Sequence, residues 1–117
     1  MASSDPDAAE QSALPDGTLD VQSVQVGDHL CVLVSGVLDV GSADELEEAI
    51  RVAEKATAGA IVIDLTKLRY MDSTGLNVLL RAHNRSRNDG DRTRFMPSKY
   101  DEVRQLVAVT GASRMFD

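Results

Sequence analysis

The sequence feature that most constrains the fold is the short apolar run at 60–65, AIVIDL, which lies between two longer segments of helical pattern. The run is rich in β-branched residues and apolar at nearly every position, as expected of a strand buried within a sheet. Helices before and after such a strand indicate right-handed crossovers between parallel strands. The chain is therefore predicted to be an α/β protein.

The segments on either side of this run carry the spacing of amphipathic helices. The first helix is predicted over 42–59, where Ser42 and Glu45 form the pattern of a capping box and Gly59 supplies a stop. The second is predicted over 73–87. The inward-facing residues of the first helix are Leu46, Ala49, Ile50 and Ala53. Those of the second helix are Leu76, Leu79 and Leu80.

Two β-branched runs precede the first helix. Segments 19–26 and 29–40 are separated by Gly27 and Asp28, which is a hairpin signal. The second run is apolar on both faces, as in the central strand of a sheet. Cys31 lies in this run and is predicted to be a buried, inert thiol.

The remaining segments complete the expected order of elements. Residues 66–71 are predicted to form a connecting loop, 92–96 a short strand, and 98–111 a third helix that Ser98 caps and Gly111 ends. The apolar stripe of that helix consists of Val103, Leu106 and Val107. The order β-β-α-β-α-β-α predicts a mixed β-sheet with helices packed mainly on one face.

Composition limits the number of domains and the kind of partner. A chain of 117 residues forms one domain, and 43% hydrophobic against 3% aromatic residues predicts an aliphatic core. Residues 1–18 are acidic and without periodicity, so we expect a disordered tail followed by a folded domain over 19–117. A net charge of −7 argues against binding to nucleic acid.

The same sequence indicates a soluble cytoplasmic protein. A single cysteine excludes an internal disulfide and fits a reducing compartment. No segment reaches the about 18–20 apolar residues that span a bilayer, and a signal-peptide pattern is missing. His29 and His83 have no Cys, Asp or Glu at ligand spacing, so no metal site is expected.

The join between the loop and the second helix carries three small oxygen-bearing side chains, Asp72, Ser73 and Thr74, followed by Gly75. The simplest interpretation is a helix N-terminus with Asp72 as the N-cap. An aspartic protease would need two Asp-Thr-Gly or Asp-Ser-Gly copies, and a hydrolase elbow would need Gly where Tyr70 or Met71 stands. A phosphate-binding loop would need more glycines and a Lys. No catalytic residue and no cofactor are therefore predicted.

A modification site is the other interpretation of this join. A hydroxyl in the first turn of a helix is accessible to a kinase, and a phosphate there adds about −1.5 to −2 charges. The helix tolerates the added charge because its N-terminus favours anions. A partner docked on that end would be repelled if it presents carboxylates or packs tightly. The motif therefore suits a switch that preserves the fold and abolishes an interface.

Three ordered segments resemble the STAS-domain anti-sigma factor antagonists, also called anti-anti-sigma factors. AIVIDLTKLRYMDSTGLNVLL resembles the family's strand, loop and Asp-Ser-Ser/Thr-Gly-Leu helix start. SGVLDVGSADELEEAI is similar to its Gly-x-Leu/Ile-Asp segment, and MPSKYDEVRQLVAVTGASRMF to its Pro-Ser segment. The resemblance spans 19–116.

The resemblance implies a bacterial partner-switching protein that binds and is modified but is not an enzyme. Unphosphorylated, such a protein binds an anti-sigma factor that is also a serine kinase, and so releases a sigma factor. The kinase binds the ATP and phosphorylates the residue that matches Ser73, and a PP2C-type phosphatase reverses this step. The positions that match the family's partner-binding surface are Asp39, Asp72, Ser73, Thr74, Gly75, Leu76 and Asn77.

Three departures from the family pattern qualify these expectations. Val37 stands where the family often has Glu, and Asn77 replaces a common Gly. The family usually continues through a last strand and helix beyond the position of Asp117, so a shortened fold or chain is expected, and an uncovered edge would favour self-association. Two other hypotheses stay open. One is a STAS scaffold or regulatory docking module that is never phosphorylated; the other is a hydrolase.

Overall fold

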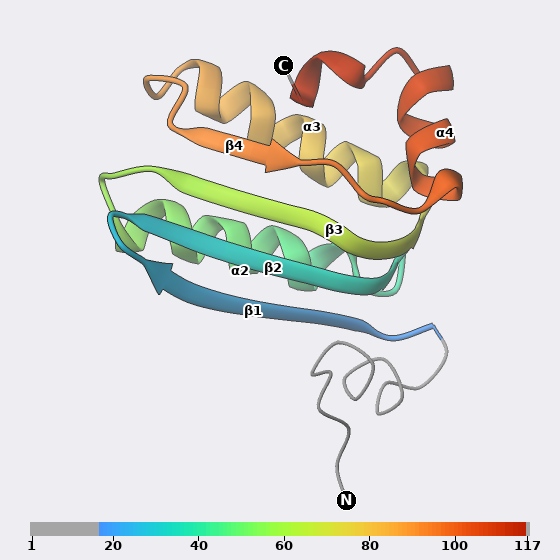
Figure 1. Ribbon diagram of the computed structural model, residues 1–117, viewed down its shortest axis with the longest axis horizontal. Helices are drawn as coiled ribbons and strands as arrows, with labels where there is room; N and C mark the ends of the chain where they lie inside the picture. Colours follow the sequence, from blue (N-terminus) through green and yellow to red (C-terminus); the bar gives the residue numbers. More distant parts are fainter. Residues whose placement is uncertain (1–16, 117) are drawn as a thin grey trace, which may run out of the picture.

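The computed structural model describes residues 17–116, and Figure 1 shows its arrangement of strands and helices. Residues 1–16, which make up most of the predicted acidic tail, lie outside the described part, and so does Asp117. The elements in chain order are β1 (Leu19–Val26), β2 (His29–Leu38), α2 (Ala43–Ala56), β3 (Ile61–Met71), α3 (Ser73–Arg87), β4 (Thr93–Met96), α4 (Asp101–Val109) and the 3-10 helix η1 (Ser113–Phe116).

The four strands form one mixed sheet, as predicted, and their order across the sheet is β1-β2-β3-β4. β1 and β2 form the expected antiparallel hairpin, in which Val26 pairs with His29 and Gly27 adopts a φ of 58°. β2 and β3 are parallel, as are β3 and β4. The carboxyl ends of β2 and β3 therefore meet at the same edge of the sheet.

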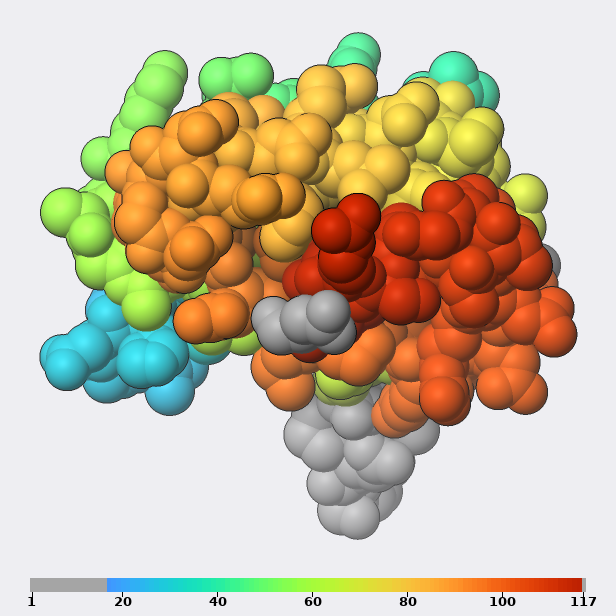
Figure 2. Space-filling model, turned by 90° about the horizontal axis from the view of Figure 1, so that it is seen from above, coloured from blue at the N-terminus to red at the C-terminus, as the bar shows by residue number. Residues whose placement is uncertain are grey.

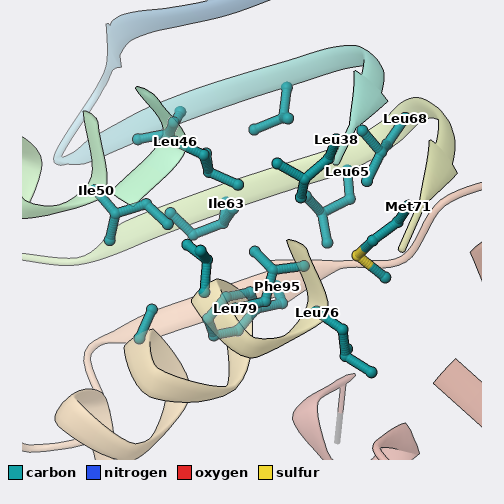
Figure 3. Packing of buried hydrophobic residues seen from close by; sticks show 14 of the residues in the cluster. Leu38, Leu46, Ile50, Ile63, Leu65, Leu68, Met71, Leu76, Leu79 and Phe95 are labelled. Carbon is teal, nitrogen blue, oxygen red and sulfur yellow. The ribbon is translucent and has the colours of Figure 1, made fainter. Parts of the chain in front are cut away.

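One face of the sheet carries the core, since α2 and α3 pack on it (Figures 1 and 3). The core is aliphatic apart from Phe95, as the composition predicted. β2 is a central strand between β1 and β3, as predicted. Its other face is partly open, since Leu33 is 37% exposed and Cys31 is half-buried, so the prediction that Cys31 is buried was wrong. An apolar run of residues does not reveal which of its sides the helices α2 and α3 will cover.

The predicted loop at 66–71 is the second half of β3, so that prediction was also wrong. The register between β2 and β3 shifts twice, between Leu33 and Ser35 and again between Gly36 and Val37. Each shift places an extra residue in β3 and breaks the alternation of buried and exposed side chains that identifies a strand in sequence. Leu68 and Met71 are nevertheless buried.

Two predicted helix caps are also corrected. Ser42 precedes α2 but makes no side-chain capping bond; its hydroxyl instead accepts the Asp39 N–H and donates to the Val37 carbonyl. Ser98 accepts the N–H of Tyr100 and donates to the carbonyl of Leu68, so it ties α4 to β3 from outside the helix. Both hydroxyls donate to the carbonyl of a strand residue, Val37 in β2 and Leu68 in β3, and do not cap their own helix.

The predicted helix ends are partly right. α2 ends at Ala56, before the predicted stop at Gly59, and its C-terminal carbonyls accept hydrogen bonds from the Arg92 guanidinium. Gly111, with a φ of 75°, follows α4 as predicted, and the Ala112 N–H donates to the Val107 carbonyl.

The C-terminal part of the described chain packs against β4, the outer strand of the sheet. η1 lies against β4, and in Figure 2 this red segment packs beside α3. Ala112 and Met115 are buried there. Within 17–116, none of the helices combines the length and hydropathy that crossing a bilayer requires.

Candidate functional site

The candidate site lies at the edge of the sheet where β2 and β3 end. Leu38 and Met71 form the last pair between these parallel strands. The Asp72 N–H donates to the Leu38 carbonyl at 3.1 Å, which joins the residue after β3 to the end of β2. Asp39 and Asp72, which are far apart in the sequence, thus follow neighbouring strand ends.

Asp72 is the N-cap of α3, as predicted. Its backbone is extended, with φ −102° and ψ −177°, and its Oδ1 accepts the Gly75 N–H at 3.0 Å. Its carbonyl accepts the N–H of Leu76, which begins the helical hydrogen bonding. Ser73 is therefore the first residue of α3, and both Ser73 and Thr74 are exposed. The cap holds the serine hydroxyl at the positive end of the helix dipole.

Gly75 brings α3 close to the end of β2. A Cβ at this position would lie 2.5 Å from Cγ of Leu38 and 3.1 Å from the Leu38 carbonyl oxygen, both closer than side chains normally approach. Gly75 and Leu76 are buried, whereas Asn77 is exposed. Of the predicted partner-binding residues, Gly75 and Leu76 thus support the surface from below.

Substitution of Gly75 by Ala is expected to lower the free energy of unfolding by about 1–3 kcal/mol, because the new methyl group must displace Leu38 or the first turn of α3. Urea denaturation of the purified chain measures this change. Gly59→Ala is the matched control, since its Cβ would approach no atom closer than 3.4 Å. A Gly75→Ala chain as stable as wild type would show that the two elements have room to separate.

The turn after β2 is held by its own hydrogen bonds. Oδ1 of Asp39 accepts the Gly41 N–H at 3.0 Å. It also lies 3.3 Å from the Ser42 hydroxyl, whose one proton is shared between this oxygen and the Val37 carbonyl at 3.1 Å. The Asp39 carbonyl accepts the N–H groups of Ser42 and Ala43. Asp39 is half-buried and therefore orders this turn beside the site as well as contributing charge to it.

Two exposed apolar side chains at this edge were not among the predicted site residues. Val40 is 75% exposed in the turn after β2, and Tyr70 is 44% exposed near the end of β3. Tyr70 pairs with Val37, the position where the family often has Glu. The sequence pattern predicts Val40 at the end of a strand and Tyr70 in a loop. The sequence signal for Val40 is an apolar residue that directly follows Asp39 and shortly precedes the next helix.

The described residues show no basis for a metal centre. No group of three or more His, Cys, Asp and Glu side chains within 17–116 is arranged to hold an ion. His83 packs edge-on against Phe95, with ring centroids 6.1 Å apart. The site offers the exposed hydroxyl-bearing residues Ser73 and Thr74, the half-buried carboxylates of Asp39 and Asp72, and the exposed side chains of Val40 and Tyr70.

Comparisons with known proteins agree with this arrangement. The STAS domain family model matches residues 20–117. An anti-sigma-B factor antagonist from Listeria monocytogenes is 33% identical over 90 residues, covering 77% of this chain and 78% of that protein. A crystal structure of an anti-sigma factor antagonist from Mycobacterium paratuberculosis superposes with a TM-score of 0.71 at 26% identity, covering 86% of this chain and 84% of the other. The phosphorylated form of the Bacillus cell fate determinant SpoIIAA shares the fold, with a TM-score of 0.63 at 18% identity over 84% of this chain and 89% of that one.

Proposed function

The chain belongs to the STAS-domain family, and we propose that it is an anti-sigma factor antagonist switched by phosphorylation of Ser73. Proteins of this kind regulate by binding, so the chain is a regulatory binding protein and not an enzyme. The observation that carries the proposal is the position of Ser73, exposed as the first residue of α3 and next to the N-cap Asp72.

In the unphosphorylated state the chain binds an anti-sigma factor with serine kinase activity and so releases the sigma factor. The kinase then transfers the γ-phosphoryl group of its own ATP to Oγ of Ser73. A P–O bond to Oγ forms, the bond to the departing ADP breaks, and the hydroxyl proton is lost. A PP2C-type phosphatase hydrolyses the phosphoserine and restores the binding form.

The local structure supports a phosphate at Ser73 without loss of the fold. The N-terminus of α3 favours negative charge, and Asp72 already occupies the N-cap with an acceptor bond from Gly75. SpoIIAA, which shares this fold, has been solved in a phosphorylated form. The phosphate and the Asp72 carboxylate together would make the site strongly negative, which opposes any partner that presents carboxylates or excludes water.

Incubation of the full chain with its anti-sigma factor kinase and ATP tests the proposal. The kinase is identified by co-purification with this chain from the native host. Mass spectrometry is expected to place one phosphate on Ser73 in the wild type and none there in Ser73→Ala. A wild-type chain that binds the kinase but stays unmodified at Ser73 would favour the phosphate-independent scaffold.

A further inference from the structure

We propose that Val40 and Tyr70 are the apolar anchors by which this protein holds the anti-sigma factor kinase, one on each of the two strand ends beside Ser73. This inference rests on the proposed function and names the partner-contacting residues that the motif does not contain. It requires that the kinase has an apolar surface around its own binding site for Ser73.

Both side chains are open to solvent, Val40 at 75% and Tyr70 at 44% exposed. Aromatic and apolar residues that become fully covered on binding supply most of the free energy of a typical interface. Tyr70 also brings a hydroxyl, which suits the rim of such a contact.

The backbone at both residues is held by hydrogen bonds. The turn that carries Val40 is held by the Gly41 N–H on Asp39 and by the Ser42 hydroxyl, which bonds to Val37 and Asp39. Tyr70 lies within β3, in register with Val37. A backbone that is already ordered loses little conformational entropy when a partner covers it.

Val40 and Tyr70 both lie within a few residues of Ser73 along the two paired strands. Tyr70 is three residues before Ser73, and Val40 is three residues after Val37, the partner of Tyr70 in the sheet. Three residues span at most about 10 Å of chain, and paired strands lie about 5 Å apart. One partner surface of ordinary size therefore reaches all three side chains.

An exposed apolar residue at the far end of the sheet lacks this connection. Val26, which is 56% exposed, pairs with His29 at the start of β2 and so lies at the opposite edge of the sheet from Ser73. The site at the carboxyl edge is distinguished because its apolar side chains flank a modifiable hydroxyl.

These anchors also give a physical reason why a phosphate would break the complex. If the contact around Ser73 is apolar and dry, a phosphate of about −1.5 to −2 charges must lose its water without gaining a partner there. The loss of binding then follows from the cost of desolvating the phosphate beside the carboxylate of Asp72.

The test measures the affinity of the full chain for the purified anti-sigma factor kinase by isothermal titration calorimetry. A non-hydrolysable ATP analogue keeps Ser73 unmodified. Val40→Ser and Tyr70→Ser are compared with wild type, with the distant control Val26→Ser and with Ser73→Asp. Thermal melts verify that each variant is folded, which matters most for Tyr70 because it lies within a strand.

We expect Val40→Ser and Tyr70→Ser each to weaken binding about tenfold or more, and Val26→Ser to change it less than about twofold. If folded Val40→Ser and Tyr70→Ser bind like wild type while Ser73→Asp does not, the anchors are wrong and the proposed function stands. If Ser73→Asp binds as tightly as the wild-type chain, the phosphorylation switch is wrong, whatever the anchors do. If wild type does not bind the kinase at all, both proposals are overturned.

Discussion

Replacement of Ser73 by Asp is expected to lower the affinity for the anti-sigma factor kinase at least about 100-fold, which corresponds to roughly 2.7 kcal/mol. The new carboxylate stands in for the phosphate at the first residue of α3, directly after Asp72. It introduces a charge into the centre of the proposed interface, and that charge must lose its water when the apolar contact forms. Calorimetry on the full chain measures the loss.

The same substitution is expected to leave the fold intact. An acidic residue in the first turn stabilises a helix by about 0.3–1 kcal/mol, so the melting temperature should stay level or rise slightly. Ala58→Asp is the control matched in charge, because Ala58 is exposed in the turn before β3, at the other end of that strand. Equal losses of affinity in both variants would attribute the effect to net charge alone and contradict a site-specific switch.

Substitution of Leu76 by Ala is expected to lower the free energy of unfolding by about 2–5 kcal/mol. Leu76 is 3% exposed and belongs to the same core as Leu38, Met71 and Leu79 (Figure 3), so truncation leaves a cavity under the candidate site. This loss is a large part of the about 5–15 kcal/mol that stabilises a typical domain. Urea denaturation measures it.

Asn77→Ala is the control on the same helix turn. Asn77 is exposed, and a surface substitution of this kind usually changes stability by no more than about 0.5 kcal/mol. A Leu76→Ala chain that unfolds close to wild type would contradict the burial of Leu76. Because Leu76 supports the surface without forming it, its effect on binding should disappear when only the folded fraction is counted.

Much of the fold follows from local patterns. The hairpin turn at Gly27, the helix that Asp72 starts and the end of α4 at Gly111 are each set by a few adjacent residues, and each was predicted. The second half of β3 was missed because its two register shifts depend on the partner strand β2. Alternation in one strand cannot reveal a bulge that exists only in a pair.

The two helix caps that were predicted wrongly, at Ser42 and Ser98, also depend on contacts with other segments of the chain. Ser42 and Ser98 satisfy local capping patterns, yet their hydroxyls bond to the carbonyls of Val37 and Leu68, residues that belong to strands. A hydroxyl has one proton and two lone pairs, and which groups it meets depends on the packing of the whole chain. Local patterns identify a helix start but leave open which partner the serine takes.

By itself the sequence determined the α/β class, the aliphatic core and the place of Ser73 directly after an N-cap, since these depend on residue types at short spacing. Only the tertiary structure decided that Asp39 and Asp72 share one edge, that Gly75 must be small to meet Leu38, and that Val40 and Tyr70 stay open to solvent. Whether a side chain is exposed depends on how all the other segments of the chain pack. It is therefore a property of the folded protein and cannot be predicted from a short stretch of residues.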